Sequence, residues 1–127
     1  MASKPECKWT KQVCRQLEAL GAQVFAAVGG MYQKNGWPDR CVWHKDFCGW
    51  LEFKYGDGKL SSLQAYTCQR LWDIAPGSVW VVRGGIVGLC QIETIDGLIA
   101  NCFDGSGKDL LAGLKVCKLN TVLEDKK

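Results

Sequence analysis

The chain has 127 residues, of which 47% are hydrophobic and 23% charged, and its formal net charge is +3. These values predict a single globular domain, residues 1–127, and they exclude an intrinsically disordered chain. The net charge permits contact with nucleic acid without arguing for it. No stretch reaches the ~18 apolar residues of a membrane helix, and the first residues lack the apolar segment of a secretory signal. We therefore expect a cytoplasmic protein without a membrane partner.

The first predicted element is a helix over residues 4–20 that ends at Gly21. Its apolar stripe consists of Trp9, Val13, Leu17 and Leu20, and its basic stripe of Lys4, Lys8, Lys11 and Arg15. The basic stripe is either a solvated helix face or a contact for the DNA backbone through Lys8, Lys11 and Arg15. Glu6 projects from the apolar stripe, where a charge needs a partner. It is either an inward-facing acid or the second half of a capping box with Ser3.

A hairpin is predicted after a short apolar strand over residues 23–28 and a glycine-rich loop over 29–38. Residues 39–44 and 49–55 are rich in β-branched and aromatic side chains and flank the turn-prone pair Lys45-Asp46. Alternation along the second strand puts Glu52 and Lys54 on one face. Antiparallel pairing then brings Asp39 opposite Glu52 or its neighbour, so two carboxylates and an ammonium group converge.

A helix is predicted from Ser61 to about Ile74, and Ser61 and Gln64 have the spacing of a capping box. Strands follow over residues 78–83 and 86–93, and the first of them should run parallel to the strand before the helix. Residues 94–127 are predicted to form a β-rich extension. It would contain strands at 98–103 and 115–122 and a short helix at 108–114.

The eight cysteines are scattered without a C-x-x-C pair, so we expect mostly reduced, buried thiols. Cys41, His44 and Cys48 have the spacing C-x2-H-x3-C, which is compatible with part of a zinc site. However, Cys41 and His44 project to opposite faces of their strand, and no fourth ligand is close in sequence. Zinc or iron–sulfur binding, or a catalytic base at His44, is therefore the less favoured hypothesis.

Three sequence features together resemble the PD-(D/E)xK nucleases: Pro38-Asp39, Glu52-Phe53-Lys54 and the helix start Leu60–Gln64. Within this superfamily, residues 6–83 are most similar to the small VRR-NUC domains of phages and to archaeal-type Holliday junction resolvases. The resemblance implies an α/β fold with a restriction-endonuclease-like core (αβββαβ) over residues 6–93. This core is a mixed central sheet flanked by helices.

The resemblance also implies a site for Mg²⁺ or Mn²⁺, since its donors would be hard oxygens. Asp39, Glu52 and the Phe53 carbonyl would bind the ion, and Lys54 would act on the attacking water or the developing charge. Similar nucleases often add an acid from the first helix. Glu6 is favoured for this role because it projects from the apolar stripe and its distance ahead of Leu20-Gly21 resembles the VRR-NUC pattern, whereas Glu18 lies next to the basic stripe. They also place a glutamine beside the site, which makes Gln64 a candidate catalytic residue.

The expected partner is DNA, with branched or four-way-junction DNA implied by the resemblance, and the expected assembly is a homodimer. Lys34 and Lys59 are further candidate phosphate contacts. The family often carries a basic residue near the end of the first strand, where this chain has Ala26 and Ala27. The alternatives are a nuclease that nicks or cuts DNA without sequence preference, and a non-catalytic DNA-binding or assembly module on the same fold.

Overall fold

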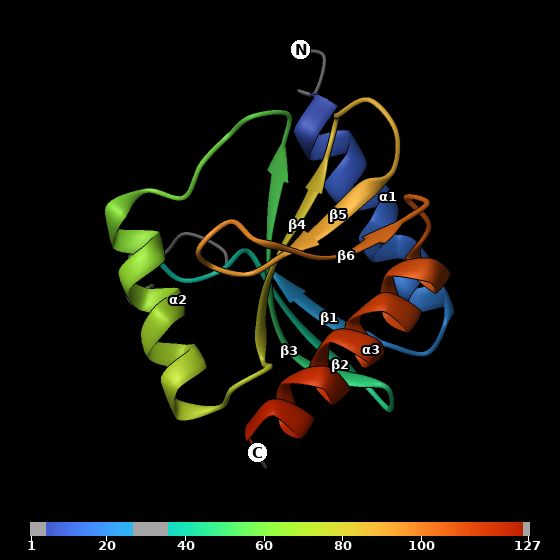
Figure 1. Ribbon diagram of the computed structural model, residues 1–127. Helices are drawn as coiled ribbons and strands as arrows, with labels where there is room; N and C mark the ends of the chain where they lie inside the picture. Colours follow the sequence, from blue (N-terminus) through green and yellow to red (C-terminus); the bar gives the residue numbers. More distant parts are fainter. Residues whose placement is uncertain (1–4, 27–35, 126–127) are drawn as a thin grey trace.

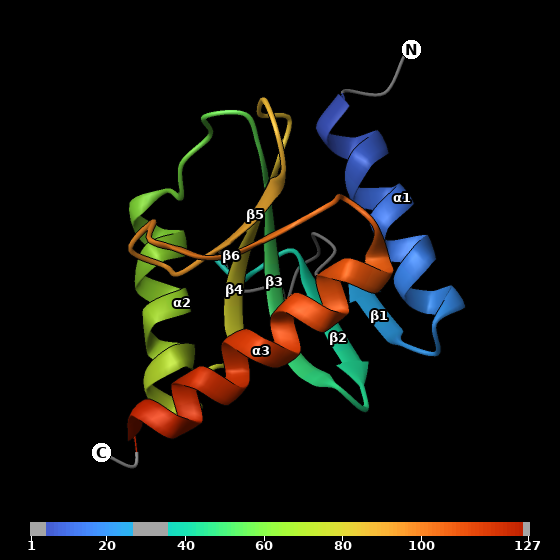
Figure 2. The same cartoon turned by 45° about the vertical axis from the view of Figure 1, so that its right-hand side comes forward.

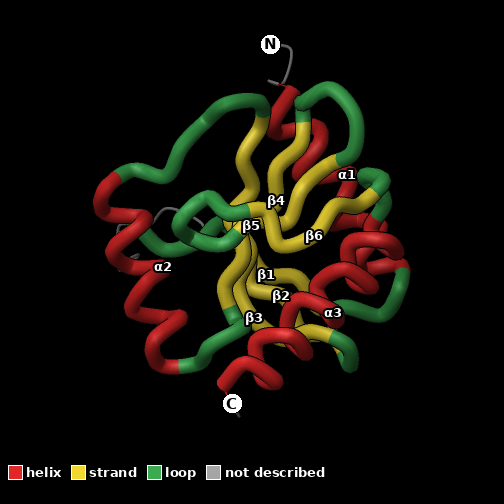
Figure 3. Tube along the Cα trace, viewed as in Figure 1, coloured by secondary structure: helices red, strands yellow, loops and turns green. Residues whose placement is uncertain are grey.

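The computed structural model describes residues 5–26 and 36–125, which form an α/β protein (Figures 1 and 3). The elements follow in the order α1 (Pro5–Ala19), β1 (Gln23–Ala26), β2 (Arg40–His44), β3 (Phe47–Tyr55), α2 (Ser62–Ile74), β4 (Val79–Gly84), β5 (Cys90–Glu93), β6 (Ile99–Phe103) and α3 (Gly107–Asp125). Within this part of the chain, three helices therefore accompany a six-stranded mixed sheet. The expected succession αβββαβ is confirmed for α1 to β4.

The sheet has its strands in sequence order, from β1 at one edge to β6 at the other. The neighbours β3 and β4 are parallel, as predicted, with α2 as the crossover between them. The other neighbouring strands are antiparallel. In the β2–β3 hairpin His44 pairs with Phe47 and Arg40 with Leu51, so Asp39 comes next in register opposite Glu52. The predicted convergence of Asp39 and Glu52 is confirmed.

The two faces of the sheet have different covers. Helices α1 and α3 pack on one face, and α2 lies on the other (Figures 1 and 2). The main apolar core lies under α1 and α3 and includes Val13, Leu17, Leu51, Phe53, Leu110 and Leu114. Because side chains alternate along β3, burial of Leu51 and Phe53 in this core turns Glu52 and Lys54 toward α2.

The predicted strand over residues 115–122 is wrong, because these residues belong to α3. Their Val and Thr side chains favour a strand locally, but helical spacing buries Leu110, Leu114 and Cys117 on one stripe against the sheet. The predicted helix at 108–114 therefore continues to Asp125. The predicted strand over residues 98–103 is confirmed as β6. The prediction of a mainly β C-terminal extension is wrong, because most of its residues belong to α3.

Strand boundaries also differ from the sequence prediction, and β3 begins at Phe47, two residues before the expected start. The strand expected over residues 86–93 begins only at Cys90, because Gly85 and Gly88 have positive φ angles and keep the preceding residues in a loop. Strand β1 is described as Gln23–Ala26, and residues 27 and 28 of the expected strand lie outside the described residues. None of the three helices combines the length and the apolarity that crossing a membrane requires.

We predict that Gly49→Ala destabilises the fold where β3 meets β4. A Cβ atom at this position would collide with the backbone carbonyl of Ser78, which accepts a 2.7 Å hydrogen bond from the Trp50 amide. The free energy of unfolding should fall by roughly 2 kcal/mol or more in urea denaturation. Gly58→Ala is the matched control, since its nearest contact would be an ordinary 3.6 Å. Equal stability of the two variants would contradict this packing.

Candidate active site

The carboxylates of Asp39 and Glu52 meet at the start of β2. The Asp39 amide donates to Glu52 Oε2 at 3.0 Å, and the Phe53 amide donates to Asp39 Oδ2 at 3.1 Å. This reciprocal arrangement follows from the hairpin register, which places Asp39 one step beyond the Arg40–Leu51 pair. Asp39 is half-buried, whereas Glu52 is only 2% exposed. The hairpin therefore holds two acids side by side against α2.

Lys54 and Gln64 complete the cluster around Glu52. Lys54 Nζ lies 3.8 Å from Glu52 Oε1, and Gln64 Nε2 donates to the same oxygen at 3.2 Å. Lys54 Nζ also donates to Gln64 Oε1 at 3.4 Å. The cluster thus contains a carboxylate pair, an ammonium group and an amide on the α2 face of the sheet.

The start of α2 explains why Gln64 reaches this cluster. Ser61 is the N-cap and accepts a 3.1 Å hydrogen bond from the Gln64 amide, while Gln64 Oε1 accepts one from the Ser61 amide at 2.9 Å. The predicted capping box is confirmed. Gln64 also donates to Glu52, because one end of the side-chain amide accepts and the other donates. Its role as a catalytic residue stays a prediction.

Burial makes Glu52 an unusual acid. Burial, together with the negative charge of Asp39, raises the pKa of Glu52 to about 8, although the positive charge of Lys54 opposes the shift. The direction follows from placing a second carboxylate in a site with little access to water. A divalent cation between the two acids would favour the ionised form of both.

The oxygens of this cluster fit a hard divalent cation. The N–H and C=O of one strand residue point to the same side, so the Phe53 carbonyl faces the Asp39 side, beyond the last β2–β3 pair. Two carboxylates and one carbonyl are a donor set that suits Mg²⁺ or Mn²⁺, whose remaining positions are filled by water and substrate. Among the described residues no three His, Cys, Asp or Glu side chains gather as a metal site.

Of the other predicted site residues, those whose side chains the structure describes are not brought to this cluster. Lys8, Lys11 and Arg15 are exposed on α1, which packs on the opposite face of the sheet. Lys59 is exposed in the turn before α2 and lines a neighbouring cavity. Lys34 and the side chain of Glu6 lie outside the described residues, and Glu18 is exposed. Roles in DNA binding for the basic residues stay predictions.

His44, the histidine of the possible zinc site, is hydrogen-bonded to neighbouring backbone groups. His44 Nδ1 accepts from the Asp46 amide at 3.0 Å, and Nε2 faces the Leu20 carbonyl at 3.2 Å. Both ring nitrogens of His44 are thus hydrogen-bonded, one at the hairpin turn and the other at the end of α1.

All eight cysteines are free thiols, as expected. Only Cys14, Cys68 and Cys117 are buried, so the expectation of mostly buried cysteines is wrong.

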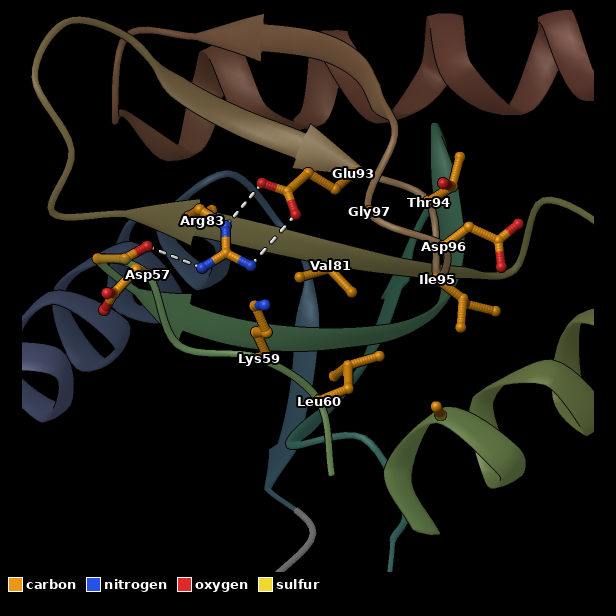
Figure 4. A pocket seen from close by; sticks show the side chains of 12 residues that line it. Asp57, Lys59, Leu60, Val81, Arg83, Glu93, Thr94, Ile95, Asp96 and Gly97 are labelled. Carbon is orange, nitrogen blue, oxygen red and sulfur yellow. Dashed lines mark hydrogen bonds and ion pairs between the residues drawn. The ribbon is translucent and has the colours of Figure 1, made fainter. Parts of the chain in front are cut away.

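Sequence reasoning missed the pair Arg83 and Glu93 beside the cluster. Arg83 is the register partner of Lys54, and its guanidinium donates to Glu93 Oε2 at 2.7 Å and to the Gly56 and Gly58 carbonyls at 2.8 and 2.7 Å (Figure 4). Glu93 is 5% exposed. Alternation along the predicted strand 78–83 would have placed Arg83 on the face of Glu52 once the parallel register was known.

Comparisons with known proteins add no assignment to this geometry. No protein-family model matches the chain, and no curated protein is significantly similar to it. The functional argument therefore depends on the motif residues and on how the fold arranges them.

We predict that Glu52 makes the stability of the metal-free protein depend on pH. Its folded-state pKa of about 8 exceeds the ordinary value of 4.5. Between these values the folded protein holds a proton that the unfolded chain has released, so the free energy of unfolding falls as the pH rises through this window. This contribution is fully present below the ordinary pKa. Glu52→Gln should flatten the dependence in urea denaturation at several pH values with EDTA. Equal slopes for variant and wild type would contradict the assignment.

Proposed function

We propose that this protein is a divalent-metal-dependent DNA endonuclease of the PD-(D/E)xK type, with a restriction-endonuclease-like core. The observation that carries the proposal is the convergence of Asp39, Glu52 and Lys54 on one face of the β2–β3 hairpin. These are the three chemical positions of the motif. The succession α1 to β4, with β3 and β4 parallel, is the core arrangement that the motif implies.

Hydrolysis of a phosphodiester needs an activated water, stabilisation of the negative charge on the phosphate and help for the departing alkoxide. A Mg²⁺ or Mn²⁺ ion held by Asp39, Glu52 and the Phe53 carbonyl would supply Lewis acidity and an activated water. Lys54 places a positive charge next to Glu52, where it neutralises charge on the phosphate or orients the water. Gln64 holds Lys54 and Glu52 in position through its amide.

The substrate class that we propose is branched DNA, including four-way junctions, cut by a homodimer. Within this α/β fold, selectivity would come from the shape of the DNA and from pairing of two subunits. A nuclease that nicks or cuts DNA without sequence preference uses the same cluster and differs only in substrate range.

A non-catalytic DNA-binding or assembly module is the second candidate, and one observation favours it. Among the described side chains, no buried polar atom lacks a hydrogen-bond partner. Glu52 in particular is bonded by Asp39 and Gln64, so the cluster is complete as a structural network. On this hypothesis the acids would hold the hairpin against α2 and would not carry out any reaction.

We predict that the purified protein cuts four-way-junction DNA in Mg²⁺ or Mn²⁺ and is inactive with EDTA. Junction, flap, linear duplex and single-stranded DNA of the same length should be compared on denaturing gels. Equal cutting of all four removes the selectivity for branched DNA, and no cutting with either ion removes the nuclease assignment. A monomer in light scattering at micromolar concentration contradicts paired cutting by two subunits.

Lys54→Ala and Asp39→Asn should each lower the cleavage rate at least about 100-fold, because each removes a charge at the reacting phosphate or its metal ion. DNA binding should persist in fluorescence anisotropy. Lys45→Ala is the matched control, since Lys45 is exposed in the turn at the opposite end of the hairpin from Asp39. If Lys54→Ala cuts as fast as Lys45→Ala, Lys54 has no part in the chemistry.

A further inference from the structure

A cavity of about 560 Å³ lies next to the catalytic cluster on the α2 side of the sheet (Figure 4). Leu60, Ala65, Val81 and Ile95 form the apolar part of its lining, and polar side chains that include Arg83 and Glu93 form the rest. The exposed side chains at its rim are Asp57, Lys59 and Asp96. Apolar walls with a few fixed polar groups are typical of a site for a small organic group.

The register of β3 and β4 fixes the place of this cavity relative to the proposed reaction. Val81 is the partner of Glu52, and Arg83 is the partner of Lys54. On the helix side, Ala65 directly follows Gln64. The cavity therefore begins one strand away from Glu52, whereas Asp39, Glu52 and Lys54 do not line it themselves. The cavity and the cluster therefore share the α2 face of the sheet on neighbouring strands.

The charges in the cavity disfavour a phosphate as its occupant. Arg83 is already neutralised by Glu93, which it contacts through Nε at 2.7 Å and through Nη2 at 3.3 Å. Asp57 and Asp96 add negative charge at the rim, and Lys59 is the remaining cation among the lining residues. Carboxylates accept hydrogen bonds from amino and imino groups, which nucleobases present on their edges.

The guanidinium of Arg83 is held in one orientation, because four hydrogen bonds join it to Glu93, Gly56 and Gly58. A fixed planar guanidinium can stack on a flat ring. This buried ion pair has no role in the proposed hydrolysis. It does, however, provide a rigid surface beside the apolar walls.

We propose that this cavity binds one unpaired nucleobase of the nucleotide next to the scissile phosphate. A base in an intact duplex cannot enter, so the preferred substrate carries an unpaired or easily extruded nucleotide at the cut. Lys59, at the rim, contacts the adjoining backbone phosphate. This inference rests on the proposed nuclease function and adds the base subsite that makes junctions and flaps better substrates than duplex.

Cleavage of oligonucleotides with one abasic residue, moved stepwise past the cut, tests the subsite. With wild-type protein, one flanking position should slow cleavage roughly 5- to 100-fold, which is the contribution of one stacked base. Ala65→Phe fills the cavity from α2 and should slow cleavage of the intact strand and abolish the sensitivity to that position. Ala112→Phe, at an exposed position of α3, is the matched control and should retain it. Uniform rates at all abasic positions overturn the proposal.

A second measurement separates the subsite from the nuclease function. Binding of dAMP or dTMP in EDTA should shift the amide NMR signals of Ala65 and Gly97, and Ile95→Trp, which fills the cavity from the turn after β5, should abolish the shift. Shifts without cleavage support the cavity as a nucleoside site and reject the proposed function. Cleavage without shifts, and without an effect of Ile95→Trp, rejects the subsite and leaves the nuclease assignment in place.

Discussion

The burial of the Glu52 carboxylate is the constraint on which the candidate active site of this protein depends. A carboxylate that is 2% exposed is costly unless other groups compensate for the lost water. The compensation comes from the Asp39 amide, the Gln64 amide group and the Lys54 ammonium group. These partners belong to the segment before β2, the first turn of α2 and β3 itself. Their joint contact with Glu52 therefore fixes the hairpin and α2 relative to each other.

The burial of Glu52 affects both the stability of the fold and the proposed binding of a cation. The raised pKa of Glu52 shows that burial and Asp39 destabilise its charged form. A cation bound between the two acids would relieve that cost, so a site that is strained without metal would gain from binding one. The Gln64 side chain has two roles, because it caps α2 and also orients Glu52. The core under α1 and α3 takes no part in this network and supplies the rigid support.

Local sequence patterns were sufficient for the elements that carry the candidate site. The turn at Lys45-Asp46 set the hairpin register, and the S-x-x-Q pattern located the start of α2. Tertiary packing decided the parts that local patterns missed. Residues 115–122 are helical because α3 buries a stripe against the sheet, which no short window reveals. Arg83 and Glu93 are brought together by the pairing of β4 with β5. The cavity beside them is lined by several separate segments between residues 56 and 97, which only the tertiary fold brings together.

The central claim is that Asp39, Glu52 and the Phe53 carbonyl hold one divalent cation at the reacting phosphate. Anomalous diffraction from crystals grown with Mn²⁺ and a short DNA tests it most directly. The account predicts an anomalous peak within coordination distance, about 2.0–2.3 Å, of oxygens from all three residues. It also predicts a DNA phosphate in the same coordination sphere, with Lys54 beside it. An empty cluster, with Glu52 still bonded only to Asp39, Gln64 and Lys54 while DNA binds elsewhere, would contradict it.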